Sequence, residues 1–126
     1  MEVPILKQQD YLIVSIQAVL TDEDLVALRD SLVQKVGQFR SIGVIVDVTG
    51  LDVMDSFSVR TLRDVAHMIR LRGAETVIVG IQPEVAFAMV QLGLTLEDVA
   101  TALDLEEGLA YLNARPKRVQ RSKSAP

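Results

Sequence analysis

The chain of 126 residues has the length of one ordinary domain, and its 49% hydrophobic residues suffice for a core without disulfides or structural metals. The absence of cysteine excludes disulfides, thiol nucleophiles and cysteine metal sites, and it suits a cytoplasmic protein. No apolar run approaches the roughly 18 residues that cross a bilayer, so we expect neither membrane insertion nor a targeting segment.

The formal net charge of −4 conceals a strong asymmetry along the chain. Five of the thirteen basic side chains lie in residues 115–126, which carry no acid, so residues 1–114 hold eight basic against seventeen acidic side chains. A body this acidic repels nucleic acid phosphates, and we expect no nucleic acid partner. We predict one folded domain over residues 1–114 and a basic, disordered tail over residues 115–126.

The first part of the chain predicts a strand hairpin and then a helix. A β-branched run at residues 11–16 (YLIVSI) and an apolar pair at residues 5–6 are typical of two paired strands. Thr21 and Asp24 have the spacing of a capping box and precede leucines at helical intervals. This pattern predicts a helix over residues 22–38, ending near Gly37.

The middle of the chain predicts a strand, helix, strand unit. Residues 43–48 (GVIVDV) and 76–81 (TVIVGI) contain continuous apolar runs, which favour strands buried on both faces. Apolar residues return at helical spacing between Ser56 and Gly73. The two strands should therefore be parallel, with residues 43–48 at the centre of the sheet.

The last part predicts two short helices around an edge strand. Pro83 suits the first turn of a helix that ends at Gly93, and residues 99–102 suit a short edge strand. Asp104, together with Glu107, should cap a final helix. The fold class is therefore α/β, with a mixed, mostly parallel sheet covered by helices.

The segment at residues 47–58 (DVTGLDVMDSFS) is where we expect function, because sites in open α/β sheets cluster at the carboxyl ends of strands. Ser56 falls at the predicted N-cap of a helix, where the dipole and free N–H groups favour a phosphate by about 0.3–1 kcal/mol. The spacing alone leaves open that Ser56 is only a capping residue. A phosphate would add roughly −1.5 to −2 charges beside Asp52 and Asp55, which predicts release of a bound partner.

The order of these features resembles the STAS domains of anti-sigma factor antagonists, up to about residue 114. The shared features are the strand ending in Asp47, the pair Asp55-Ser56, the amphipathic helix, Gly73, the valine-rich strand and Pro83. Within this family, four motifs are most similar to the RsbS-type scaffold proteins of bacterial stressosomes, namely residues 55–57 (DSF), 80–83 (GIQP), 92–94 (LGL) and 101–104 (TALD).

The resemblance implies a STAS fold and a non-enzymatic scaffold and antagonist in a stress or sigma factor pathway, with no cofactor. Such proteins self-associate into a large assembly with RsbR-type STAS proteins. They sequester a switch serine/threonine kinase of the RsbT type and release it when that kinase phosphorylates them, and a PP2C-type phosphatase resets the system. The family's acceptor is the serine after the acid, which is Ser56 here. Most relatives continue with a small residue, whereas this chain continues with Phe57 and a second hydroxyl at Ser58, so Ser58 is an alternative acceptor.

We also expect residues around the acceptor to contact the partner. Asp52, Asp55 and Phe57 flank Ser56 in the sequence, and Arg60 and Arg63 fall on roughly one side of the following helix. A solvated arginine face paired with nearby acids is the alternative interpretation.

An enzyme is not expected from the residues present. The one histidine, His67, lies about three helical turns from Ser56, roughly 15 Å at 1.5 Å per residue, so we expect a surface or partly buried helix residue and no serine triad. The sequence has no nucleophile elbow, no phosphate-binding loop ending in lysine, and no histidine pair spaced for a metal.

A receiver-like signalling domain is the alternative from another class, with Asp47 as the phosphoacceptor and Mg²⁺ held by neighbouring carboxylates. That chemistry needs further acids and a lysine at the strand ends. Gln17 and Gln82 follow the corresponding strands instead, so we interpret Asp47 as a strand-end residue.

Overall fold

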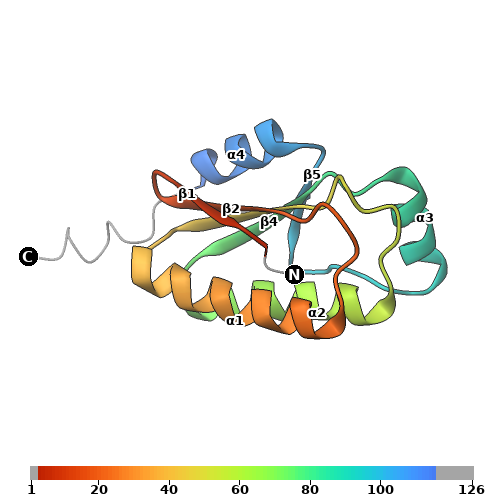
Figure 1. The fold of residues 1–126 in the computed structure, drawn as a ribbon. Coiled ribbons are helices and arrows are strands. Elements are labelled where there is room, and N and C mark those ends of the chain that lie inside the picture. Colours follow the sequence, from red (N-terminus) through yellow and green to blue (C-terminus); the bar gives the residue numbers. More distant parts are fainter. Residues whose placement is uncertain (1–2, 116–126) are drawn as a thin grey trace, which may run out of the picture.

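The computed structural model describes residues 3–115, and the remainder of the predicted tail lies outside the described residues (Figure 1). The chain folds into β1 (Ile5–Gln8), β2 (Tyr11–Ser15), α1 (Asp22–Phe39), β3 (Gly43–Asp47), α2 (Ser56–Leu71), β4 (Glu75–Val79), α3 (Pro83–Gln91), β5 (Ala100–Ala102) and α4 (Leu105–Ala114).

The strands form one mixed sheet in the order β1-β2-β3-β4-β5. The pair β1 and β2 is antiparallel, and β2 to β5 are parallel, with Ile13, Ile45 and Val77 in register across the centre. The predicted hairpin, central strand and edge strand are thereby confirmed. Because β2 to β5 are parallel, their carboxyl ends share one edge of the sheet, and each of α1 to α4 follows a strand that ends there.

The sheet is covered on both faces, as the continuous apolar runs predict. Val44 and Val46 belong to a core cluster with α1 and α2, whereas Ile45 packs in a second cluster with Leu112 of α4. Figure 1 shows α1 and α2 on one side of the sheet and α4 on the other. Val44, Ile45 and Val46 of β3 each have an exposed fraction of 1% or less, so the middle of this strand is enclosed on both faces.

Helix ends follow local capping rules. Thr21 Oγ1 accepts a hydrogen bond from Asp24 N–H at 3.0 Å, which confirms the predicted capping box. Asp104 Oδ1 accepts from Glu107 N–H at 2.9 Å, which confirms the cap of α4. Helix α1 runs past Gly37 to Phe39, because the left-handed residue is Arg40, at φ 51°.

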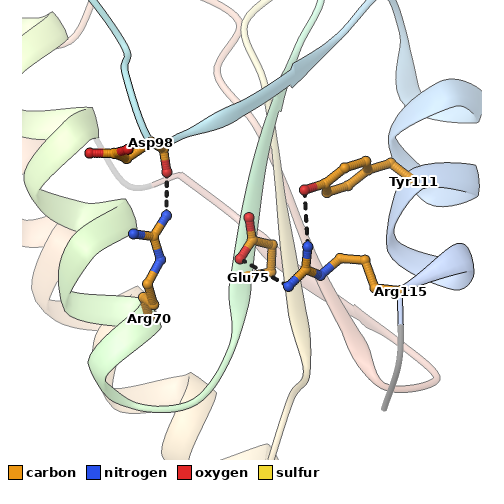
Figure 2. A network of polar contacts seen from close by, with 5 residues as sticks. All are labelled: Arg70, Glu75, Asp98, Tyr111 and Arg115. Carbon is orange, nitrogen blue, oxygen red and sulfur yellow. Dashed lines mark hydrogen bonds and ion pairs between the residues drawn. The ribbon is translucent and has the colours of Figure 1, made fainter. Parts of the chain in front are cut away.

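Two polar contacts join segments that are far apart in the sequence (Figure 2). Arg70 of α2 donates to the backbone oxygen of Asp98, in the segment that leads into β5. Arg115 lies 3.7 Å from the carboxylate of Glu75 and donates to the hydroxyl of Tyr111 at 3.1 Å. Arg115 is the first residue of the predicted disordered tail, yet its side chain contacts the start of β4. Within the described range, every helix is too short or too polar to cross a lipid bilayer.

Candidate functional site

The loop between β3 and α2 begins with a turn held by its own side chains. Asp47 Oδ1 accepts hydrogen bonds from the N–H of Thr49 at 2.9 Å and from its hydroxyl at 2.6 Å. An aspartate that bonds the backbone two residues ahead stabilises a tight turn. Among residues 3–115, no three acidic or histidine side chains converge on a possible metal site. The two hydrogen bonds to Thr49 make Asp47 the strand-end residue that closes this turn.

The rest of the loop alternates between the core and the surface. Leu51 and Met54 are buried, with exposed fractions of 6% and 7%, and the N–H of Leu51 donates to Val48 O at 2.9 Å. Asp52 and Val53 point outward and are exposed. Because Leu51 and Met54 are both buried, the backbone between them has one defined path, which sets where α2 begins.

Asp55, and not Ser56, is the N-cap of α2. The carboxylate of Asp55 accepts from the N–H of Ser58 at 2.8 Å, and Ser56 is the first helical residue. The expectation that Ser56 sits at the N-cap was therefore wrong by one position. Aspartate and serine cap helices about equally well, so the sequence offered two adjacent candidates and no local rule to separate them.

The carboxylate of Asp55 is stabilised in its charged form. Hydrogen bonds from the backbone and then the side chain of Ser58 lower the pKa of Asp55, and the positive charge of Arg60 acts in the same direction. Desolvation opposes these effects and is smaller than the backbone hydrogen bond. A charged carboxylate at the helix start also interacts favourably with the helix dipole.

The two candidate serines differ in what their side chains contact. Ser58 interacts with Asp55 through both its N–H and its side chain. Ser56 is half-buried, and its hydroxyl makes no hydrogen bond to any of the described residues. Phe57, between them, is partly buried and packs against the main core cluster. The hydroxyl of Ser56 is thus without a hydrogen-bond partner among the described residues, in a turn whose other two residues, Phe57 and Ser58, pack against the core and bond to Asp55.

The predicted partner-binding arginines also have different surroundings. Arg60 is exposed, whereas Arg63 is half-buried and donates to Thr95 O at 3.2 Å. Arg63 and Arg70 therefore both hold the segment between α3 and β5, a role that the sequence spacing did not indicate. His67 is exposed on α2, as predicted.

Negative charge gathers at the carboxyl edge of the sheet, where the helices begin. The acids in the caps, first turns and preceding loops of the four helices are Asp22, Glu23, Asp24, Asp52, Asp55, Glu84, Asp104, Glu106 and Glu107. Many of the described basic residues lie toward the opposite helix ends, namely Lys35, Arg40, Arg70, Arg72 and Arg115. Ser56 therefore lies at the acidic end of the molecule.

Comparison with known proteins identifies the fold family. The sequence model of the STAS domain matches residues 2–108. The chain belongs to the STAS domain family. It is 33% identical over 82 residues to the RsbT co-antagonist protein RsbRA of Bacillus subtilis, and 30% identical over 81 residues to RsbRD of the same organism. These matches cover 65% and 64% of this chain but only 30% and 29% of those relatives, so the chain spans about a third of their length.

Solved structures give fuller coverage. A serine-to-glutamate variant of Moorella thermoacetica RsbS superposes with a TM-score of 0.77 at 34% identity, covering 88% of this chain and 94% of that one. A chain from a solved structure of the stressosome, described as a signal integration and transduction hub, matches with a TM-score of 0.73 at 35% identity. The match covers 87% of this chain and 96% of that one. The anti-sigma factor antagonist SpoIIAA in its unphosphorylated form matches at 11% identity with a TM-score of 0.68, which shows the shared fold alone. The predicted STAS fold and the resemblance to RsbS-type proteins are confirmed.

Proposed function

We propose that this STAS protein is a stressosome scaffold that binds a switch serine/threonine kinase of the RsbT type and releases it when Ser56 is phosphorylated. The observation that carries the proposal is the uncommitted hydroxyl of Ser56 on the first residue of α2, held beside the capping carboxylate of Asp55. The likeness to RsbS supports the same proposal, since this chain is 34% identical to an RsbS variant over most of the length of both chains.

The surroundings of the two serines favour Ser56 over Ser58 as the acceptor. A phosphate on Ser58 would replace the hydroxyl that donates to Asp55, and its negative charge would repel the adjacent carboxylate. A phosphate on Ser56 would leave the hydrogen bond between Asp55 and the N–H of Ser58 in place. It would also lie within reach of the free N–H groups at the start of α2, which favour anions.

Phosphorylation would release the kinase through charge. A phosphoserine carries about −1.5 to −2 charges at pH 7, and at position 56 it would join the carboxylates of Asp52 and Asp55. A partner surface that fits the neutral hydroxyl would have to desolvate this new charge, which is costly unless it is paired. The added charge therefore weakens the contact and acts as a release signal.

The contact surface for the kinase would surround the acceptor. Asp52 and Arg60 are exposed on either side of Ser56 and offer charges of opposite sign. Asp55 is exposed as well, and Phe57 and Arg63 are half-buried and contribute their exposed edges. Arg60 is the arginine of this set that makes no hydrogen bond or ion pair within residues 3–115, so it is free to contact a partner.

The relatives support a wider assembly around this protein. Similarity to RsbT co-antagonist proteins and to a stressosome chain supports co-assembly with RsbR-type STAS proteins and self-association. A PP2C-type phosphatase would remove the phosphate and restore kinase binding. In this role the protein is a cytoplasmic binding module and performs no catalysis of its own.

Phosphosite mapping tests the proposal. The purified protein is incubated with ATP and an RsbT-type kinase, and fragment mass spectrometry locates the phosphate. We expect modification at residue 56 in the wild type and in Ser58→Ala, and none in Ser56→Ala. Phosphate on Ser58 alone would overturn the choice of acceptor, and an unmodified wild-type chain would overturn the switch.

A further inference from the structure

The motif at residues 80–83 (GIQP) contacts the loop that carries the acceptor. Gln82 is the N-cap residue of α3, yet its side chain makes no capping hydrogen bond to that helix. Its amide Nε2 instead donates to the backbone oxygen of Thr49 at 2.7 Å, across 33 positions of the sequence. A side chain in a capping position thus bonds the neighbouring loop.

Thr49 is enclosed from the same side by the backbone of the loop between β4 and α3. Gly80 adopts φ +79°, and a Cβ placed on it would lie 1.9 Å from Thr49 Oγ1. The hydroxyl and N–H of Thr49 are both bonded to Asp47. Thr49 therefore has little room to move toward Gly80, and its backbone oxygen faces the Gln82 amide.

The opposite side of the loop is closed by a third segment. A Cβ on Gly50 would lie 2.9 Å from the backbone oxygen of Gln17, in the loop between β2 and α1. Residues 49 and 50 are thus held between two loops, and the polar bond to one of them comes from Gln82. Further along the loop, Leu51 and Met54 are buried, which restricts the movement of the segment between Gly50 and the start of α2.

We infer that Gln82 is a positioning residue for the phosphorylation switch: its amide fixes the loop at residues 49–55 and so orients Ser56 for the kinase. The inference rests on the proposed function and extends it to a residue in another loop. A loop that already has its bound geometry requires no ordering on encounter with the kinase. When the competent geometry is only partly populated, the apparent affinity falls by that fraction while the chemical step is unchanged.

The test compares Gln82→Ala and Gln82→Glu with Gln91→Ala. Gln91 is the same residue type, exposed in the last turn of α3, and serves as the matched control. Amide hydrogen exchange is measured across the chain, and phosphorylation by an RsbT-type kinase is measured at varied protein concentrations. Loss of one hydrogen bond predicts about threefold to tenfold faster exchange in residues 49–55 of Gln82→Ala. Gln82→Glu should show a larger increase, because a carboxylate faces the carbonyl of Thr49.

In the kinase assay we expect KM to rise in both Gln82 variants, and more in Gln82→Glu, with kcat within about twofold of wild type. A general loss of stability would accelerate exchange in β3 and β4 equally, and that result would overturn the inference. Unchanged exchange in residues 49–55 of Gln82→Ala would also overturn it. If the kinase fails to modify even the wild type, the proposed function fails, and the exchange measurement still decides whether Gln82 holds the loop.

Discussion

The carboxylate of Asp55 accepts a hydrogen bond from the backbone N–H of Ser58 at 2.8 Å, and this contact closes the first turn of α2 around Ser56. Replacing Asp55 with alanine removes the cap, which costs about 1 kcal/mol of stability. We expect urea unfolding to show a lower midpoint for Asp55→Ala. Asp52→Ala is the matched control, because Asp52 is an exposed acid of the same loop that caps no helix. Equal stability of both variants would contradict the capping role.

The same carboxylate makes stability depend on pH in a predictable direction. Hydrogen bonds from Ser58 lower the pKa of Asp55 in the folded protein, so the folded state binds this proton more weakly than the unfolded state. The resulting stabilisation is fully present above the unfolded pKa of about 4 and is lost as the pH falls through the lower folded value. Asp55→Asn keeps a capping oxygen but has no ionisable group at this position, so it lacks the pH-dependent stabilisation.

Urea unfolding of the wild type and Asp55→Asn between about pH 2 and pH 7 measures this difference. We expect the wild type to be more stable at neutral pH and the advantage to shrink in acid below about pH 4. An advantage that stays constant over the whole range would show that the charge of Asp55 does not stabilise the fold.

Substitutions at Ser56 separate the effect of charge from loss of the hydroxyl. Ser56→Asp places a negative charge in the first turn of α2, whereas Ser56→Ala removes only the oxygen. We expect Ser56→Ala to bind an RsbT-type kinase as the wild type does, and Ser56→Asp to bind at least about tenfold more weakly, or 1.4 kcal/mol. Calorimetric titration measures both affinities.

The charged variant should remain folded, because an acid in the first helical turn interacts favourably with the dipole. Weak binding by Ser56→Asp would therefore reflect the contact surface and not unfolding, and thermal melting of both variants checks this. Full kinase affinity of Ser56→Asp would contradict release by charge.

Arg60 provides a test of the partner surface. It is exposed near the start of α2, and its charge lowers the pKa of Asp55 only as a minor cause. We expect Arg60→Glu to weaken kinase binding with little change in stability, since surface substitutions usually stay within about 0.5 kcal/mol. Arg72→Glu, at the far end of the same helix, is the control. Unchanged kinase binding and assembly in Arg60→Glu would exclude Arg60 from an essential contact.

The sequence predicted the architecture because its signals are local. The continuous apolar run of β3 indicated a strand enclosed on both faces, and the exposed fractions of Val44, Ile45 and Val46 agree with it. The capping box of Thr21 and Asp24 located the start of α1 to the residue. Patterns of this kind depend on neighbours within a few positions, so they can be interpreted without knowing how the chain folds back on itself.

The site could be located from the sequence but not resolved in detail. The assignment of the N-cap to Ser56 failed because Asp55 competes for the same N–H groups and the sequence does not rank the two. The bonds from Gln82 to Thr49 and from Arg63 to Thr95 join segments about 30 positions apart. Such contacts depend on which loops meet at the sheet edge, and the choice between Ser56 and Ser58 as the acceptor stays a prediction.

Two glycines with similar backbones test how tightly the acceptor loop is held. Gly80 and Gly93 both have positive φ, +79° and +69°, so alanine at either position costs about 1–2 kcal/mol in backbone strain. They differ in their surroundings. A Cβ at Gly80 would lie 1.9 Å from Thr49 Oγ1, whereas a Cβ at Gly93 would have no heavy atom within 4 Å.

We therefore expect Gly80→Ala to lower the free energy of unfolding by about 1–3 kcal/mol more than Gly93→Ala, as overpacking typically does. Urea unfolding of both variants measures the difference. In a Thr49→Ala background, which removes the hydroxyl, the excess cost of Gly80→Ala should fall, because the two substitutions act on one contact. Equal costs for Gly80→Ala and Gly93→Ala in the otherwise unchanged protein would mean that Thr49 moves aside freely, and the loop leading to Ser56 would then be loosely held.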